Sequence, residues 1–275
     1  MISYLQGASA FVIGACIGSF LNVCIARWPK DESVIAPRSR CPRCGRGITA
    51  AENIPIVGWL LLRGRCRGCG GSISLLYPGV ELTVALIWLA AAMTFGFGFT
   101  ALRVAIFGSM LFGIAVTDAK HYVIPDGFTV FGLIWVALTA TAALFLRDVS
   151  PFAEFTDMLL GACVGAGAVA IAGWLGELAF GKEAMGFGDV TLMAVVGAAV
   201  GPWRALLTIF VGALIGAIGF LAIVYPIVAI RSRRRSGEFE PPLVPFGVFL
   251  APAAMVTLLW GRELIDWYQR RILAP

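Results

Sequence analysis

The chain is poor in histidine and in charge. It has a single histidine, His121, among its 275 residues. A metal site made of several histidines is therefore excluded, and a Ser-His-Asp triad would have to use that one residue. Asp, Glu, Lys and Arg together make up only 13% of the chain, against about 25% in an ordinary soluble domain. The sequence thus has too little charge for the surface of a large soluble enzyme.

Long uncharged runs take the place of the missing charges. Apolar residues make up 59% of the chain, and its mean hydropathy is +0.89. A membrane-spanning helix needs about 20 mostly apolar residues, so these runs predict an all-α polytopic membrane protein with about eight transmembrane helices. The predicted spans, of which the sixth and eighth are short, are 4–26, 77–97, 101–116, 122–146, 155–180, 190–200 with its flanks, 206–230 and 245–260.

The basic residues indicate how these spans are oriented. Alternating the eight spans puts fifteen of the 21 lysines and arginines on one side of the membrane and six on the other. The positive-inside rule makes the more basic side cytoplasmic. The net charge of +5 then needs no nucleic-acid partner, because these residues orient the protein and contact anionic membrane lipids. We see no internal repeat in the chain.

The longest polar insertion, residues 28–76, contains two CxxC pairs. Cys41 and Cys44 are separated by 21 residues from Cys66 and Cys69. Each pair can direct two thiolates at one metal, and four thiolates complete a closed tetrahedral zinc site of the structural kind. Two disulfides or four unused thiols are the alternatives, and a reducing cytoplasm disfavours disulfides. The small loop would take its folding free energy from the metal.

This insertion divides the chain. The predicted domains are a first transmembrane helix (1–27), a cytoplasmic four-cysteine zinc-binding domain (28–76) and a seven-helix membrane domain (77–275).

Two aspartates lie at the ends of predicted spans. Asp118 closes the third, and Asp189 opens the sixth after Gly186-Phe187-Gly188. The predicted topology puts both at the cytoplasmic edge, and carboxylates near the bilayer are functional candidates because they are costly there. Two carboxyl groups that share a proton form an aspartic-protease dyad. The alternatives are a helix N-cap for Asp189 and an ion-paired helix end for Asp118.

The helix positions also suggest how the two carboxyl groups divide their roles. The C-terminal end of a helix carries partial negative charge and the N-terminal end partial positive charge. We therefore predict Asp118 as the protonated partner and Asp189 as the base.

Taken in order, the motifs of this chain resemble those of bacterial type IV prepilin peptidases. These enzymes are bifunctional leader peptidases and N-methyltransferases of the GxGD aspartic protease group. The segments that carry the resemblance are 14–23, 38–44, 52–56, 62–66, 77–82, Asp118 with 124–126, 183–190 and 244–251.

The resemblance implies that Asp118 and Asp189 are catalytic. It implies that the substrates are prepilins or pseudopilins, whose N-terminal helices are cleaved at the cytoplasmic face of the bacterial inner membrane. It further implies that the new N-terminal amine is methylated from S-adenosylmethionine. No strand, glycine-rich loop and helix of the dinucleotide-binding kind is present, so the residues that bind this methyl donor stay unidentified.

Two other interpretations stay open. In the first, the chain is a peptidase only, and its zinc loop positions the substrate. In the second, it is an ion-coupled transporter in which the two aspartates relay protons. The second is disfavoured because transporter sites usually lie near the midplane of the bilayer between repeated halves.

Overall fold

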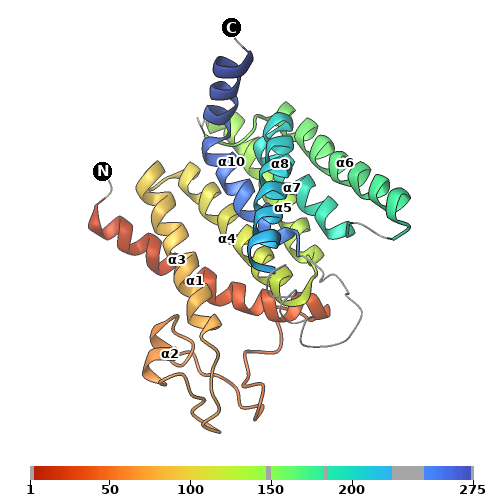
Figure 1. The fold of residues 1–275 in the computed structure, drawn as a ribbon. Helices are drawn as coiled ribbons and strands as arrows, with labels where there is room; N and C mark the ends of the chain where they lie inside the picture. Colours follow the sequence, from red (N-terminus) through yellow and green to blue (C-terminus); the bar gives the residue numbers. More distant parts are fainter. Residues whose placement is uncertain (1–2, 147–149, 183–184, 225–244, 274–275) are drawn as a thin grey trace. The chain divides into compact units, whose positions relative to one another are not determined.

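The computed structural model describes residues 3–146, 150–182, 185–224 and 245–273. All regular elements in these ranges are helices, apart from two isolated β-bridges (Figure 1). The α-helices are α1 (Tyr4–Arg27), α2 (Val57–Leu61), α3 (Leu76–Phe95), α4 (Phe99–His121), α5 (Asp126–Leu146), α6 (Phe155–Phe180), α7 (Phe187–Val200), α8 (Pro202–Gly219) and α10 (Gly247–Tyr268). In the described chain, seven helices are long and apolar enough to cross a membrane. The predicted all-α, multi-pass fold is confirmed.

The sixth predicted span, α7, is an apolar helix shorter than these seven. It has 14 residues, and at a rise of 1.5 Å per residue it is roughly 21 Å long, against about 30 Å for a hydrocarbon core. The last predicted span is longer than expected, because α10 has 22 residues and continues to Tyr268. Residues 225–230 of the seventh predicted span lie outside the described residues, as do Glu183, Ala184 and Val244 of the quoted motifs.

The chain divides into two compact units, Met1–Gly113 and Ile114–Pro275. In the first unit, α1 packs closely against α3, and Figure 1 shows the two helices crossing. Glycines make this approach possible: a Cβ on Gly14 would lie 2.8 Å from Ala85 Cα, and a Cβ on Gly18 would lie 2.7 Å from Glu81 Cα. Small residues allow helix backbones to come together in membranes. The loop that contains α2 leads from α1 back to α3.

In the second unit, α7 is the central helix. It packs against α5, α6, α8 and α10, and almost every residue from Leu192 to Val200 is buried. A helix that is apolar on all sides is expected to be enclosed by its neighbours. Its contact with α6 depends on Gly161 and Gly197, because a Cβ on either glycine would overlap the carbonyl oxygen of the other. This packing fixes the position of the N-terminal turn of α7.

Candidate functional site

Asp118 lies in the last turn of α4, which ends at His121. Only 5% of the residue is exposed. Its Oδ2 atom accepts a hydrogen bond of 3.2 Å from the backbone N–H of Val248, in the first turn of α10. The preceding residue has to be small, because a Cβ on Gly247 would lie 2.8 Å from the same oxygen. The carboxyl group of Asp118 is therefore held against the N-terminus of α10.

Asp189 lies in the first turn of α7 and is half-buried. The residue before it contacts the turn that precedes α5: a Cβ on Gly188 would lie 2.9 Å from Ile124 Cβ. The other end of the Ile124 side chain faces α10, since its Cδ1 atom lies 3.1 Å from the Cβ position of Gly247. Ile124 thus joins the segment of Asp189 to the segment that holds Asp118. Through these contacts with Ile124, the fold brings the segments of the two predicted site residues together in the second unit.

The α10 contact is the part of this site that sequence reasoning missed. The positions of both aspartates on their helices are as expected, Asp118 at a C-terminal end and Asp189 at an N-terminal end. The N-terminus of α10 adds a positive helix end and a direct N–H donor next to Asp118. The assignment of the proton to Asp118 took no account of this donor and stays a prediction. The signal in the sequence was the segment Pro245-Phe246-Gly247, which carried the resemblance but had no assigned role.

The four predicted zinc ligands form a cluster in the first unit. The Sγ atoms of Cys41 and Cys69 lie 4.0 Å apart, as do those of Cys44 and Cys66. All four sulfur atoms lie within 4.8 Å of one another, and all four cysteines are free thiols. Tetrahedral zinc with Zn–S bonds of about 2.3 Å requires sulfur atoms about 3.8 Å apart. The donor set and its spacing fit a closed zinc site, and the predicted grouping of the four thiols is confirmed.

The two CxxC arms have the same backbone structure, offset by 25 residues. Bridges join Arg40 to Gly47 and Arg65 to Ser72, and both arms repeat the same main-chain hydrogen bonds, from residue 45 to 41 and from residue 70 to 66. A glycine with φ near 70° follows the second cysteine of each arm and allows the tight turn. The expectation that the chain holds no internal repeat is therefore wrong for these arms. The signal of this short repeat is the similarity of residues 40–48 (RCPRCGRGI) to residues 65–73 (RCRGCGGSI).

The backbone turns of the arms favour the thiolate form of the first cysteine in each pair. N–H groups of Cys44 and Arg43 lower the pKa of the Cys41 thiol to about 6. The equivalent N–H groups of Cys69 and Gly68 lower the pKa of Cys66. Because a thiolate is the form that binds metal, the first cysteine of each arm is prepared for coordination before the ion arrives.

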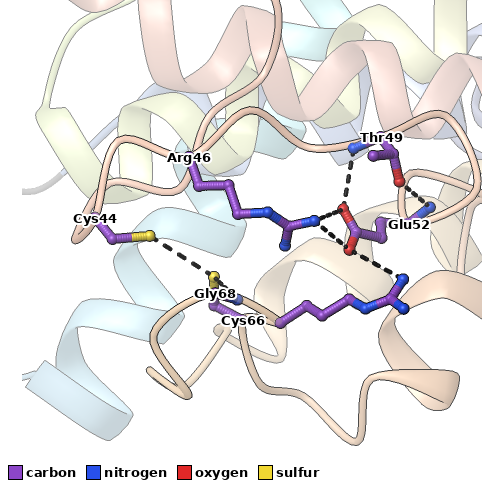
Figure 2. A network of polar contacts seen from close by, with 7 residues as sticks. Cys44, Arg46, Thr49, Glu52, Cys66 and Gly68 are labelled. Carbon is purple, nitrogen blue, oxygen red and sulfur yellow. Dashed lines mark hydrogen bonds and ion pairs between the residues drawn. The ribbon is translucent and has the colours of Figure 1, made fainter.

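Glu52 connects the two arms (Figure 2). Its Oε1 atom accepts a hydrogen bond of 3.0 Å from Arg46 in the first arm and lies 3.9 Å from Nη1 of Arg67 in the second. Its Oε2 atom accepts from the Thr49 N–H at 3.0 Å. The Thr49 N–H and the Arg46 guanidinium hold the pKa of the Glu52 carboxyl below its usual value. Only 7% of the Glu52 side chain is exposed, so this ion pair is shielded better than an ordinary surface pair.

Comparisons with known proteins agree with these features. Residues 12–95 match the bacterial peptidase A24 N-terminal domain, and residues 105–221 match the type IV leader peptidase family. A protein of Aeromonas hydrophila called prepilin leader peptidase/N-methyltransferase is 35% identical over 99% of this chain and 97% of its own length. The chain belongs to the type IV leader peptidase family. A Bacillus subtilis protein of the same name is 33% identical over 96% of this chain and 98% of its own length.

A third relative is more similar but only partly covered. The Myxococcus xanthus protein of the same name is 41% identical over 217 residues, which are 77% of this chain and 62% of that protein. No solved structure matches the chain. Membership in a peptidase family argues against the ion-coupled transporter, and both aspartates lie within the segment that matches this family.

Proposed function

We propose that this chain removes the leader peptide of type IV prepilins or pseudopilins by aspartyl chemistry and then methylates the new N-terminal amine from S-adenosylmethionine. It would act in the bacterial inner membrane, with the dyad at the cytoplasmic face. One observation carries the proposal: two aspartates from opposite helix ends, Asp118 and Asp189, lie in segments that Ile124 joins in the second unit. The peptidase family of the chain and the printed names of its relatives support both activities.

The dyad supplies a general base and a general acid. One carboxylate takes a proton from a water molecule, whose oxygen attacks the scissile carbonyl carbon. The other carboxyl group donates its proton to the carbonyl oxygen. When the tetrahedral intermediate breaks its C–N bond, the leaving amine takes a proton from one carboxyl group, and the other carboxylate takes back the proton of a diol hydroxyl as the C=O bond re-forms, so the dyad returns to its starting state. Both carboxyl groups are needed. At the start, one must be deprotonated to accept the proton of the water molecule and the other protonated to donate to the carbonyl oxygen, and a single group cannot be both.

The backbone beside Asp189 suits the approach of a peptide. Gly186 and Phe187 are accessible to solvent, and Gly186 and Gly188 have no side chains that would obstruct a peptide. An accessible segment with two glycines can lie close to an extended substrate strand. We therefore assign the scissile bond to the space next to this turn.

Cys41, Cys44, Cys66 and Cys69 would hold Zn²⁺. When bound, the ion supplies structural cross-linking, because four thiolates fill its tetrahedral coordination and leave no position for a substrate. The proposed role of residues 28–76 is therefore that of a zinc-stabilised domain. The dyad, and not the metal, carries the peptidase chemistry.

The test is cleavage of a purified model prepilin by wild type, Asp118→Asn and Asp189→Asn, measured by mass spectrometry. General acid–base groups contribute roughly 10²–10⁴ in rate, so each variant should lose at least about 100-fold. Asp266→Asn is the matched control, because Asp266 is exposed and forms only a surface pair with Arg270 among the described residues. Full turnover by either dyad variant would show that the assignment is wrong.

The same spectra decide between the bifunctional enzyme and a peptidase alone. A methylated N-terminus adds one CH₂ to the mass of the mature product. Product that is cleaved but never methylated, although S-adenosylmethionine is supplied, would favour a peptidase whose zinc loop positions the substrate.

A further inference from the structure

The first unit contains a cavity of about 390 Å³. Pockets for small molecules usually measure about 300–1,000 Å³. Helices α1 and α3 contribute one part of its lining, with Asn22 and Glu81, and residues between 39 and 74, in the CxxC arms, α2 and the segments that join them, contribute the rest. The cavity is therefore built between a helix pair and the four-cysteine segment. Neither the dyad nor the metal cluster explains its polar side chains on α1 and α3.

Glu81 is a buried carboxylate at this cavity. Only 8% of the residue is exposed. Its Oε2 atom accepts a hydrogen bond of 2.6 Å from the Ile56 N–H, and the Ser19 hydroxyl also contacts it. Both of these partners are neutral. In the part of the chain that the structure describes, ion pairs form at Glu52 and Asp266 and not at Glu81. A buried charge is costly unless a charge of opposite sign compensates it, so Glu81 suits a cationic ligand.

The remaining lining suits a molecule that carries several kinds of group. The Asn22 amide donates through Nδ2 to the Tyr77 carbonyl at 3.0 Å, which leaves its oxygen as an acceptor for a ligand. The Trp59 ring is fixed by a hydrogen bond of 3.1 Å from its Nε1 to the Ile73 carbonyl. A fixed indole can stack on a flat base or face a cation.

Charge of the opposite sign is present at the same cavity. Arg40 and Arg43 line it, and both are accessible to solvent. Arginines of this kind are well suited to bind a carboxylate. The cavity thus combines an anionic group, cationic groups, an amide acceptor and an aromatic face.

We propose that this cavity binds S-adenosylmethionine, with the carboxylate of Glu81 against a cationic group of that molecule. The proposal rests on the methyl-transfer half of the proposed function. S-adenosylmethionine carries a sulfonium, an ammonium, a carboxylate and an adenine, and the lining offers a partner for each of them. In the transfer, the amine of the cleaved substrate must first release its proton to water. Its lone pair then forms the new N–CH₃ bond, while the C–S bond breaks and the sulfur keeps the electron pair.

The test measures binding, without methyl transfer. Zinc-loaded full-length protein in detergent is titrated with radiolabelled S-adenosylmethionine in equilibrium dialysis, as wild type, Glu81→Gln and Glu177→Gln. Glutamine keeps an oxygen for the Ile56 N–H but removes the charge. We expect saturable binding by wild type and at least tenfold weaker binding by Glu81→Gln. The control should bind within twofold of wild type, because Glu177 is exposed on α6 and does not line the cavity.

A second measurement does not depend on the fold of the variant. An 8-azido analogue of S-adenosylmethionine is photolysed on the wild-type protein, and the labelled peptides are identified by mass spectrometry. Labels within residues 19–81 support the site, and excess unlabelled S-adenosylmethionine should remove them. Labels confined to residues 114–275 would overturn it, as would equal affinities of wild type and Glu81→Gln.

Failure of the site and failure of the function give different results. If the cavity is the wrong site, wild type still methylates cleaved prepilin and Glu81→Gln binds the methyl donor normally. If methyl transfer itself is wrong, wild type neither binds S-adenosylmethionine nor yields methylated product. A prepilin N-terminal peptide that binds the cavity when S-adenosylmethionine does not would also overturn the proposal.

Discussion

Val248 permits a test in which a single hydrogen-bond donor is removed from the proposed dyad. It is the second residue of α10, where a backbone N–H has no carbonyl partner within its own helix. Its N–H donates instead to Asp118 Oδ2. Proline lacks an N–H, and its fixed φ is tolerated in the first turn of a helix. Val248→Pro therefore removes this donor and leaves the hydrogen bonds of α10 in place.

The size of the effect follows from the kind of hydrogen bond. Asp118, the predicted proton donor, becomes negatively charged as it gives its proton to the scissile carbonyl, and a hydrogen bond to a charged group contributes about 1.5–3 kcal/mol. Because about 1.36 kcal/mol corresponds to tenfold in rate, Val248→Pro should lower kcat/KM for prepilin cleavage roughly 10- to 150-fold. The Gly247 N–H also interacts with the Asp118 carboxylate, so we expect a value in the lower half of this range.

Val248→Ala is the matched control, since alanine shortens the side chain but keeps the N–H. Initial cleavage rates over a range of prepilin concentrations give kcat/KM for both variants, and thermal unfolding in detergent checks that both are folded. We expect the alanine variant within about threefold of wild type. Equal rates for the two variants would refute the role of the donor, because only proline removes it.

Three further predictions concern the zinc loop and the helix packing. Glu52→Gln should release zinc to a chelator faster than wild type near pH 7. The difference should vanish as the pH falls from 4.5, the usual pKa of this carboxyl, through its lowered folded-state pKa, because protonated Glu52 stabilises the loop no more than glutamine does. A difference that persists at lower pH would contradict the ion pair. Gly161→Ala should lower the free energy of unfolding in detergent by about 1–3 kcal/mol, because the added methyl group overpacks against α7. Gly167→Ala is the control, because there is open space at the Cβ position of Gly167. Similar melting temperatures of the two variants would count against close α6–α7 contact. Cys66→Ser should purify without stoichiometric zinc and be cut faster by protease within 28–76, and full metal content by atomic emission would exclude the four-thiolate site.

Local patterns predicted much of the fold and the candidate ligands. The spans were predictable because a helix that crosses a bilayer needs a long apolar run, and the cysteine cluster because its ligands are close in sequence. The length of α7 was harder to predict, since burial among neighbouring helices and burial in lipid select the same apolar residues. Its N-terminal boundary at Phe187 was nonetheless close to the predicted one.

Contacts between distant segments account for what was missed. The Val248 N–H meets Asp118 across 130 positions of the chain, and a backbone donor leaves no trace in residue type. Glu81 and Asn22 stood within quoted motifs, but their shared cavity depends on the close packing of α1 and α3 at Gly18. The repeat of the CxxC arms was missed because main-chain hydrogen bonds define it more clearly than the residues do.

The enclosed helix α7 has a consequence for how this protein tolerates mutation. Asp189 stands in its first turn, and the residues from Leu192 to Val200 are packed on nearly every side. A larger side chain in that stretch has to displace the helix, and the displacement carries Asp189 with it. In a mutational scan scored by cleavage, we therefore expect 192–200 to be nearly as depleted of substitutions as the dyad, although these residues are apolar or small, almost all of them buried, and have no chemical group that could take part in the reaction.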